Sequence, residues 1–132
     1  MNIRPEGTQR LVRVVRSARA EGAYVRQMGP PGHYGHVVLI VEPSDTDGLT
    51  FVWAVGETAI PQIFSQSVLR GIQRTCSVDG PFQGCAFTRT TVRVIDGSYH
   101  DTDSKERSYE MASAMAFADA VHRAGGVDHA AS

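Results

Sequence analysis

The sequence lacks any apolar run of roughly eighteen residues, the length that a membrane-spanning helix requires, so no membrane association is expected. The N-terminal segment Met1–Glu6 has no apolar core of the kind found in secretion signals, which predicts a cytoplasmic protein. Only two cysteines occur, Cys76 and Cys85, too few for a disulfide framework or a four-cysteine zinc site. We therefore expect both to be free thiols.

Motifs of the common hydrolases are also absent. There is no Gly-x-x-x-x-Gly-Lys-Ser/Thr loop to cradle nucleotide phosphates, so the chain alone should not hydrolyse GTP. There is no Gly-x-Ser-x-Gly turn either. Ser98, His100 and Asp101 are close in sequence, but a catalytic triad is defined by geometry rather than by adjacency. We predict that the protein is not an enzyme, and an enzyme that uses His100 stays an alternative.

Histidine and carboxylate side chains offer little for a metal ion. His33 and His36 have a spacing that occurs in zinc sites, but no third ligand lies near them in the sequence. The other candidates, His100, Asp101 and Asp103, belong to a separate segment. Zinc requires three or four convergent ligands, so we predict no metal site and no cofactor.

The chain carries almost no net charge, −1 by formal count, whereas nucleic-acid-binding proteins usually have a basic excess. The distribution is uneven, because residues 1–36 contain six arginines and only two acidic residues. A basic edge in this part would be able to contact phosphates, and the candidates are Arg10, Arg13, Arg16 and Arg26. The alternative is an edge whose charges only prevent strand pairing with other chains.

Apolar periodicity predicts strands and two helices. Segments rich in β-branched or alternating apolar residues indicate strands at 10–16, 23–28, 36–42, 49–55 and 86–95. One helix begins at Ile60-Pro61, because apolar residues recur every four positions from Phe64 onward. A second helix follows Asp103, whose spacing to Glu106 is that of a capping box, and ends at Gly125-Gly126.

These elements predict an α+β fold, a two-layer sandwich of one mixed four- to five-stranded sheet with two helices on one face. The 132 residues are expected to form a single domain with loose termini at about 1–9 and 125–132. The strands at 36–42 and 49–55 are apolar on both faces, while the helices cover only one. A homodimeric interaction module, paired through the uncovered face, is therefore an alternative function.

Several motifs occur in order between Arg10 and Ala124. They are Val25-Arg26-Gln27-Met28-Gly29, Gly32-His33-Tyr34-Gly35-His36-Val37, Val41-Glu42-Pro43, Ile60-Pro61, Arg70-Gly71-Ile72 and Asp96-Gly97-Ser98-Tyr99-His100-Asp101-Thr102-Asp103-Ser104. In this order they resemble domain IV of translation elongation factor G. The family usually has Gly-Gly-x-Gly-Gln-Tyr-Gly-His in the first loop. Here Pro30 and Pro31 are present and His33 replaces the glutamine, so this loop should be stiffer and poorer at holding phosphate.

The resemblance implies the fold of the second domain of ribosomal protein S five, with a left-handed crossover. It also implies a role in translation, because the tip of domain IV in elongation factor G enters the decoding region of the small ribosomal subunit and displaces tRNA. Rings at such a tip can stack on bases, and hydroxyls can reach sugar or phosphate. The residues that this implies as RNA contacts are Gly97, Ser98, Tyr99, His100, Asp101, Gly29, Gly32, His33, Tyr34 and His36.

We therefore interpret the chain as a stand-alone protein similar to elongation factor G domain IV. It is expected to contact ribosomal RNA or tRNA through loop tips and to lack GTPase activity. Residues 125–132 carry no apolar strand of the kind that would begin the family's next domain, which favours this interpretation. The first alternative is an excised domain IV of a full-length elongation factor G.

Overall fold

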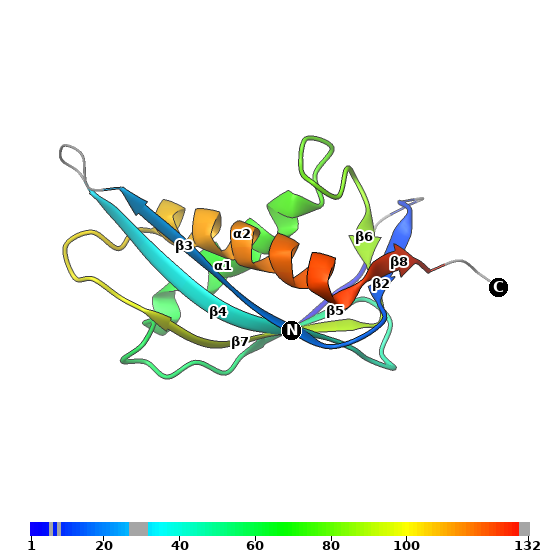
Figure 1. Cartoon of the computed structure of the whole chain (residues 1–132), viewed down its shortest axis with the longest axis horizontal. Helices are drawn as coiled ribbons and strands as arrows, with labels where there is room; N and C mark the ends of the chain where they lie inside the picture. The colour runs from blue at the N-terminus through cyan, green and yellow to red at the C-terminus, as the bar shows by residue number, and fades with distance from the viewer. Residues whose placement is uncertain (6, 8, 27–31, 130–132) are drawn as a thin grey trace.

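Residues 1–129 are described in the computed structural model, apart from residues 6, 8 and 27–31. Figure 1 shows an elongated body in which both helices lie along one side of a long twisted sheet. The elements are β1 (Asn2–Ile3), β2 (Leu11–Val14), β3 (Ala18–Arg26), β4 (His33–Pro43), β5 (Leu49–Trp53), a 3₁₀ turn (Gln62–Phe64), α1 (Ser65–Thr75), β6 (Ala86–Phe87), β7 (Thr90–Ser98), α2 (Glu106–Ala124) and β8 (Gly126–Asp128).

The main sheet has five strands in the order β1-β5-β7-β4-β3. Strands β3 and β4 form an antiparallel hairpin in which Ala18 pairs with Val41 and Arg26 pairs with His33. Strand β7 pairs antiparallel with β4 and parallel with β5, so the chain crosses over through α1 between β5 and β7. The predicted α+β fold with a mixed sheet is confirmed. The left-handedness of the crossover stays a prediction from the resemblance.

A second sheet was not predicted. It has three strands in the order β6-β2-β8 and lies at one end of the long axis (Figure 1). The single strand expected at 86–95 is wrong, because Ala86–Phe87 pairs with β2 while Thr90–Ser98 belongs to the main sheet. The chain changes sheets at Arg89, whose φ of 48° is in the left-handed region. A run of β-branched residues gives no sign of such a kink.

The termini, expected to be loose at about 1–9 and 125–132, contain paired residues at 2–3 and 126–128. Asn2 pairs with Thr50 at the edge of the main sheet, and the amino group of Met1 donates to the carbonyl oxygen of Phe51 at 2.9 Å. At the other end, Val127 pairs with Arg13 in the small sheet. Strands of two or three residues carry no periodicity of their own, so their order comes from partners that are distant in sequence.

Helix α2 approaches the main sheet closely because both surfaces carry small residues. Ala112 and Ala116 are fully buried, and a Cβ atom at Gly22 of β3 would lie 2.2 Å from the carbonyl oxygen of Ala112. Helix α1 packs on α2 in the same way, since a Cβ atom at Gly71 would lie 2.2 Å from the carbonyl oxygen of Glu110. Glycines on β3 and α1 therefore set how closely each of these elements approaches α2.

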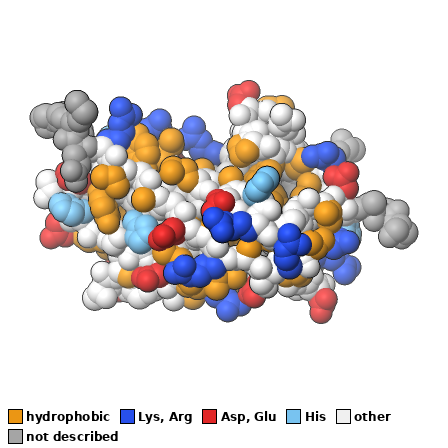
Figure 2. Space-filling view, viewed as in Figure 1, with side chains coloured by type: hydrophobic (Ala, Val, Ile, Leu, Met, Phe, Trp, Pro, Cys, Tyr) orange, Lys and Arg blue, Asp and Glu red, His pale blue; other side chains and the backbone are white. Residues whose placement is uncertain are grey.

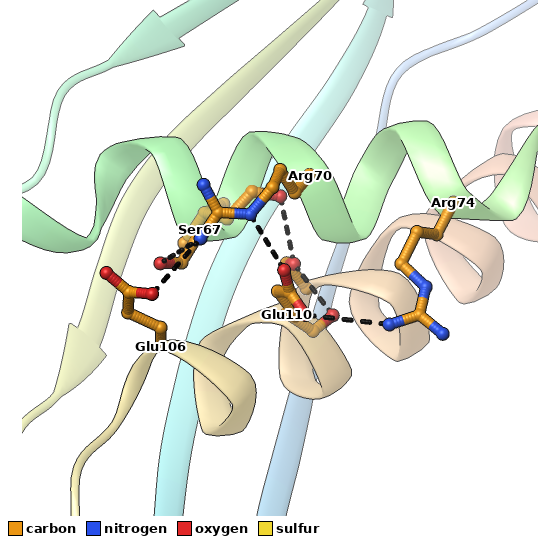
Figure 3. Close-up of polar contacts among 7 residues, drawn as sticks. Ser67, Arg70, Arg74, Glu106 and Glu110 are labelled. Atoms are coloured by element: carbon orange, nitrogen blue, oxygen red, sulfur yellow. Dashed lines mark hydrogen bonds and ion pairs between the residues drawn. The ribbon is translucent and has the colours of Figure 1, made fainter.

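Ion pairs also join the two helices (Figure 3). The guanidinium of Arg70 donates to the Glu110 carboxylate at 2.8 Å, and Arg74 lies 3.5 Å from the same carboxylate. Glu110 is the least exposed member, with 16% of its side chain accessible. The predicted stripe on the first helix is confirmed, because Phe64, Val68 and Ile72 are buried in the core.

The predicted capping box at Asp103 is wrong. Helix α2 begins at Glu106, its N-cap residue is Lys105, and no side chain caps it by a hydrogen bond. Instead, the carbonyl oxygen of Asp103 accepts a hydrogen bond from the backbone N–H of Tyr34 at 2.9 Å. Its backbone thus joins the loop after β7 to the start of β4 and does not start a helix.

The open face of the main sheet is not a continuous apolar surface. Among the described residues, Val25 is the only large apolar side chain of this sheet that is classed as exposed. On β4, Val37, Leu39 and Val41 are buried in the core on the helix-covered face, while Ile40 on the open face is half-buried and pairs with the charged, exposed Arg93 of β7. The homodimer through this face stays a prediction from the sequence.

Candidate functional site

The start of β4 and the loop of residues 99–105, which connects β7 to α2, lie at the end of the molecule away from the small sheet (Figure 1). Register explains their proximity, because His36 near the start of β4 pairs with Ser98 at the end of β7. Gly29, an expected contact residue, lies outside the described residues, as do Pro30 and Pro31. We call residues 32–34, which include the first two residues of β4, and residues 99–105 the tip.

Hydrogen bonds hold the start of β4 to the loop of residues 99–105. The backbone N–H of Tyr34 donates to the carbonyl oxygen of Asp103, and the Ser104 hydroxyl donates to the carbonyl oxygen of Tyr34, both at 2.9 Å. The ammonium group of Lys105 donates to the carbonyl oxygen of Gly32. The described residues of the tip are therefore one connected unit, which limits their independent motion.

His100 occupies the surface of the tip. Its side chain is 58% exposed, its backbone N–H donates to the Ser104 hydroxyl at 2.9 Å, and its ring centroid lies 5.6 Å from that of Tyr34. The carboxylate of Asp103 lies 3.8 Å from the imidazole. The neighbouring ring of Tyr99 is also exposed and lies 5.9 Å from that of Phe64. Two aromatic rings are thus held by packing beneath them and remain open to solvent.

His36 does not face a ligand in this way. Its Nδ1 atom lies 2.7 Å from the Ser98 hydroxyl and its Nε2 atom 2.9 Å from the Glu21 carboxylate. The hydrogen bond with His36 lowers the pKa of Glu21 below its ordinary value. The Tyr34 hydroxyl lies 2.9 Å from the same Ser98 oxygen. These contacts make His36 and Ser98 supports of the tip and leave Glu21 as a residue that sequence reasoning missed.

Ser98, His100 and Asp101, which are close in sequence, do not form a catalytic triad. No contact between Ser98 and either His100 or Asp101 is found among the described residues, and the histidine that meets Ser98 is His36. The chain Ser98–His36–Glu21 resembles a triad in composition, but its serine also engages the phenol of Tyr34. Asp101 is an exposed loop residue. The arrangement therefore suits positioning of strands and loops.

Gly97 and His33 serve the packing of the tip. A Cβ atom at Gly97 would lie 2.3 Å from the carbonyl oxygen of His36 and 2.4 Å from Ile60, so the close approach at this glycine is internal. The Nδ1 atom of His33 lies 3.4 Å from the Ser108 hydroxyl, and its ring lies 5.8 Å from that of Tyr24. Its part-buried ring braces the loop against β3 and α2.

Tyr109 of α2 is a second residue that sequence reasoning missed as part of the site. Its ring is fully buried, and its hydroxyl donates to the carbonyl oxygen of Ser98 at 2.7 Å. Burial raises the pKa of Tyr109 above its ordinary value. The sequence placed this ring on the buried side of the helix, but no local pattern indicates a hydrogen bond from its tip to the end of a strand.

The four arginines expected to contact phosphate have different surroundings. Arg10 donates to the sulfur of Cys85 at 2.9 Å and lies 3.6 Å from Asp128, and Arg16 donates to the carbonyl oxygen of Arg123 at 3.1 Å. Arg26, in the hairpin near the tip, lies 3.5 Å from the hydroxyl of Tyr24. Arg13 has no hydrogen bond or ion pair from its side chain to any described residue.

Charge is mixed over the visible surface. Figure 2 shows Lys and Arg side chains interspersed with Asp and Glu, and imidazoles toward the end that carries the tip. No group of three or more His, Cys, Asp or Glu side chains able to hold a metal ion occurs among the described residues. In the part of the chain that was searched, no helix is long and apolar enough to cross a membrane.

The sequence and the fold are similar to those of known proteins. The family described as elongation factor G, domain IV, matches residues 12–125. The chain belongs to this family. Elongation factor G of Thermotoga maritima and that of Thermotoga petrophila are each 39% identical to it over 115 residues, which is 84% of this chain and 16% of those proteins. A crystal structure of a protein from Thermus thermophilus aligns with a TM-score of 0.80 and 26% identity over 92% of this chain and 18% of that one.

The residues that match the elongation factor G domain IV family include all residues of the tip. The chain is accordingly a translation-related domain, and it spans about 16% of the length of the curated relatives. Domain IV is not the GTPase domain of these relatives. The resemblance inferred from the ordered motifs is thus confirmed.

Proposed function

We propose that this domain IV protein contacts structured RNA, in the decoding region of the small ribosomal subunit or in tRNA, through the tip. The observation that supports this proposal is the ring of His100, 58% exposed and packed against Tyr34, on a loop that is hydrogen-bonded to the start of β4. Loops held in one geometry lose little conformational entropy on binding, which favours recognition of a folded partner. The protein acts in the cytoplasm, where translation takes place, and has no GTPase activity of its own.

The chemistry of the tip favours contacts with bases and sugars. Asp101 is exposed and Asp103 lies 3.8 Å from His100, so two carboxylates flank the imidazole and disfavour phosphate oxygens there. The rings of His100 and Tyr99 can stack on unpaired bases or donate to their edges. The cations near the tip are Arg26, Lys105, which is already bonded to Gly32, and Arg107, which is exposed in the first turn of α2. We therefore expect stacking and hydrogen bonding to dominate at the tip.

We further propose that the domain works without a GTPase domain on the same polypeptide. One continuous hydrophobic cluster includes residues of both helices and of strands from both sheets, which supports folding without neighbouring domains. An excised portion of a full-length factor is the alternative. The two are separated by mapping the limits of the reading frame and the size of the protein in cell extracts. A single product several times longer than this chain would overturn the stand-alone proposal.

The tip proposal is tested by co-sedimentation with small ribosomal subunits over a salt series. His100→Ala should weaken binding by roughly tenfold, because loss of one stacked ring costs about 1–3 kcal/mol. His122→Ala is the matched control, since it removes an exposed imidazole from the far end of α2. Circular dichroism should show that both variants fold. If wild type and His100→Ala bind equally, or if neither binds at any salt concentration, RNA contact by His100 is wrong.

A further inference from the structure

A second candidate site lies at the opposite end of the molecule from the tip. One basic side chain lies there on, or shortly after, each strand of the small sheet. Arg13 is on β2, Arg89 follows β6 by two residues, and His129 follows β8 by one. Together with Val14, Pro43 and Ser44 they line a hollow of about 230 Å³. None of the sequence motifs points to this convergence, because the three residues are far apart along the chain.

The pairing of the strands puts Arg13 and His129 on the same side of the small sheet. Val12 and Val14 are buried, so Arg13 between them points to the other face. Strand β8 runs antiparallel to β2, and the backbone N–H of His129 donates to the carbonyl oxygen of Leu11 at 2.9 Å. His129 is therefore opposite Leu11, two residues from Arg13, and alternation gives both side chains the same face.

The backbone at Arg89 is the most informative feature of this hollow. Its φ of 48° is a conformation that glycine or asparagine adopts more easily than arginine. The kink is held by its neighbours, since Thr90 donates to the carbonyl oxygen of Thr88 and the backbone of Gly48 donates to the Thr88 hydroxyl, both at 2.9 Å. A long cationic side chain at a position suited to glycine points to a use for the guanidinium.

The charge in the hollow is positive. The Nε atom of Arg89 lies 3.3 Å from a carboxylate oxygen of Asp47, and both side chains remain substantially exposed. Arg13 makes no side-chain hydrogen bond or ion pair with any residue that the structure describes. Two guanidinium groups thus face one carboxylate, and the imidazole of His129 adds a further polar group. Guanidinium groups match the oxygens of phosphate in geometry and charge.

We propose that Arg13, Arg89 and His129 form a second RNA contact, a site for a backbone phosphate at the small-sheet end of the domain. This inference rests on the proposed function, because it assumes that the partner of the tip is RNA. Strand β4 runs from the tip to the hollow, and its eleven residues at about 3.3 Å each span roughly 35 Å. Only an RNA whose extended or folded form covers this distance reaches both sites. The second site would supply a salt-dependent part of the affinity.

The test uses variants that spare the fold. Arg89→Asn removes the charge and keeps a residue that tolerates a positive φ, and Arg13→Gln removes the other charge while keeping a long polar side chain. Arg19→Gln is the control, because it removes one exposed positive charge from β3, outside both sites. Thermal unfolding should show Arg89→Asn at least as stable as the wild type, since asparagine relieves backbone strain.

Binding to small ribosomal subunits is measured over the same salt series with these variants. Arg89→Asn and Arg13→Gln should each weaken binding roughly three- to tenfold at low salt and reduce the slope of log affinity against log salt by about 0.7–0.9. Arg19→Gln should leave the slope unchanged. Backbone amide spectra recorded with inorganic phosphate alone form the second arm of the test, because they report a site for the free ion.

Each outcome decides between the two sites. If His100→Ala weakens binding while Arg13→Gln and Arg89→Asn leave affinity and slope unchanged, the second site is wrong and the tip proposal stands. If those two variants lose binding and His100→Ala does not, the second site stands and the tip proposal fails. Amide shifts with inorganic phosphate combined with unchanged RNA affinity would assign the hollow to a free anion and overturn the inference. No binding by the wild type overturns both.

Discussion

Tyr109 shows how one buried side chain couples the helix layer to the tip. Its hydroxyl donates to the carbonyl oxygen of Ser98 at 2.7 Å, directly before the loop that carries His100. Replacing the hydroxyl by hydrogen leaves that carbonyl without its partner. We expect Tyr109→Phe to lower the free energy of unfolding by about 1–2 kcal/mol at neutral pH, measured by urea denaturation. A variant as stable as the wild type would show that the hydrogen bond contributes nothing.

The same residue predicts a dependence of stability on pH. Burial raises the pKa of Tyr109 above its ordinary value, which is about 10. The folded protein therefore holds the proton more tightly than the unfolded chain. This contribution is fully present below the unfolded pKa and is lost as the pH rises through the folded pKa. Above about pH 10, the melting temperature of the wild type should fall more steeply than that of Tyr109→Phe. Equal slopes would contradict this.

At the scale of elements, the contact of β3 with α2 depends on Gly22. A Cβ atom there would lie 2.2 Å from the Ala112 carbonyl oxygen and 2.8 Å from the Ala116 nitrogen, both backbone atoms that cannot rotate away. Gly22→Ala should lower the free energy of unfolding by about 1–3 kcal/mol through overpacking. Gly56→Ala is the control, because a Cβ atom at Gly56 has no neighbour within 4 Å. Equal melting temperatures for the two variants would show that α2 shifts without cost.

The elements differ in how far the sequence could predict them. Strands β4 and β5 and helix α1 have enough residues for an alternating or four-residue apolar pattern, and they were predicted with small errors at their ends. The two-residue strands β1 and β6 have no pattern, and they exist because β5 and β2 offer unpaired backbone groups. The kink at Arg89 stayed hidden because a single φ angle leaves no trace in a β-branched run.

The candidate site, like the secondary structure, could be predicted only in part from the sequence. The neighbourhood of the two segments of the tip followed from the ordered motifs, because they carry the family resemblance. The roles of single residues did not follow. His36 was expected to contact RNA, yet register brings Glu21 and Ser98 to its two ring nitrogens from other strands. The sequence does not indicate Arg89 and His129 as site residues, since only the pairing in the small sheet brings them to Arg13. Hydrogen-bond partners across strands are a property of register, which a local pattern does not encode.

For the whole molecule, the two sheets share one hydrophobic core. Val12 and Val14 of the small sheet belong to the same buried cluster as Leu39 and Phe51 of the main sheet. A common core predicts that both ends of the molecule unfold in one transition, as small domains usually do. The single tryptophan, Trp53 in β5, reports on the main sheet alone by fluorescence, whereas circular dichroism reports on all strands and helices. The two signals should give coincident denaturation curves.

Val14→Ala and Val41→Ala turn this expectation into a sharper test. Both side chains are almost fully buried, one in each sheet, and each loss should cost about 1–3 kcal/mol because two methyl groups leave a cavity. With one shared core, Val14→Ala must shift the Trp53 fluorescence transition as far as it shifts the circular dichroism transition. If the small sheet unfolds by itself, Val14→Ala leaves the fluorescence midpoint at the wild-type value while Val41→Ala lowers it. In that case the hollow around Arg13 would open before the tip, and the two proposed RNA contacts would not be held by one rigid body.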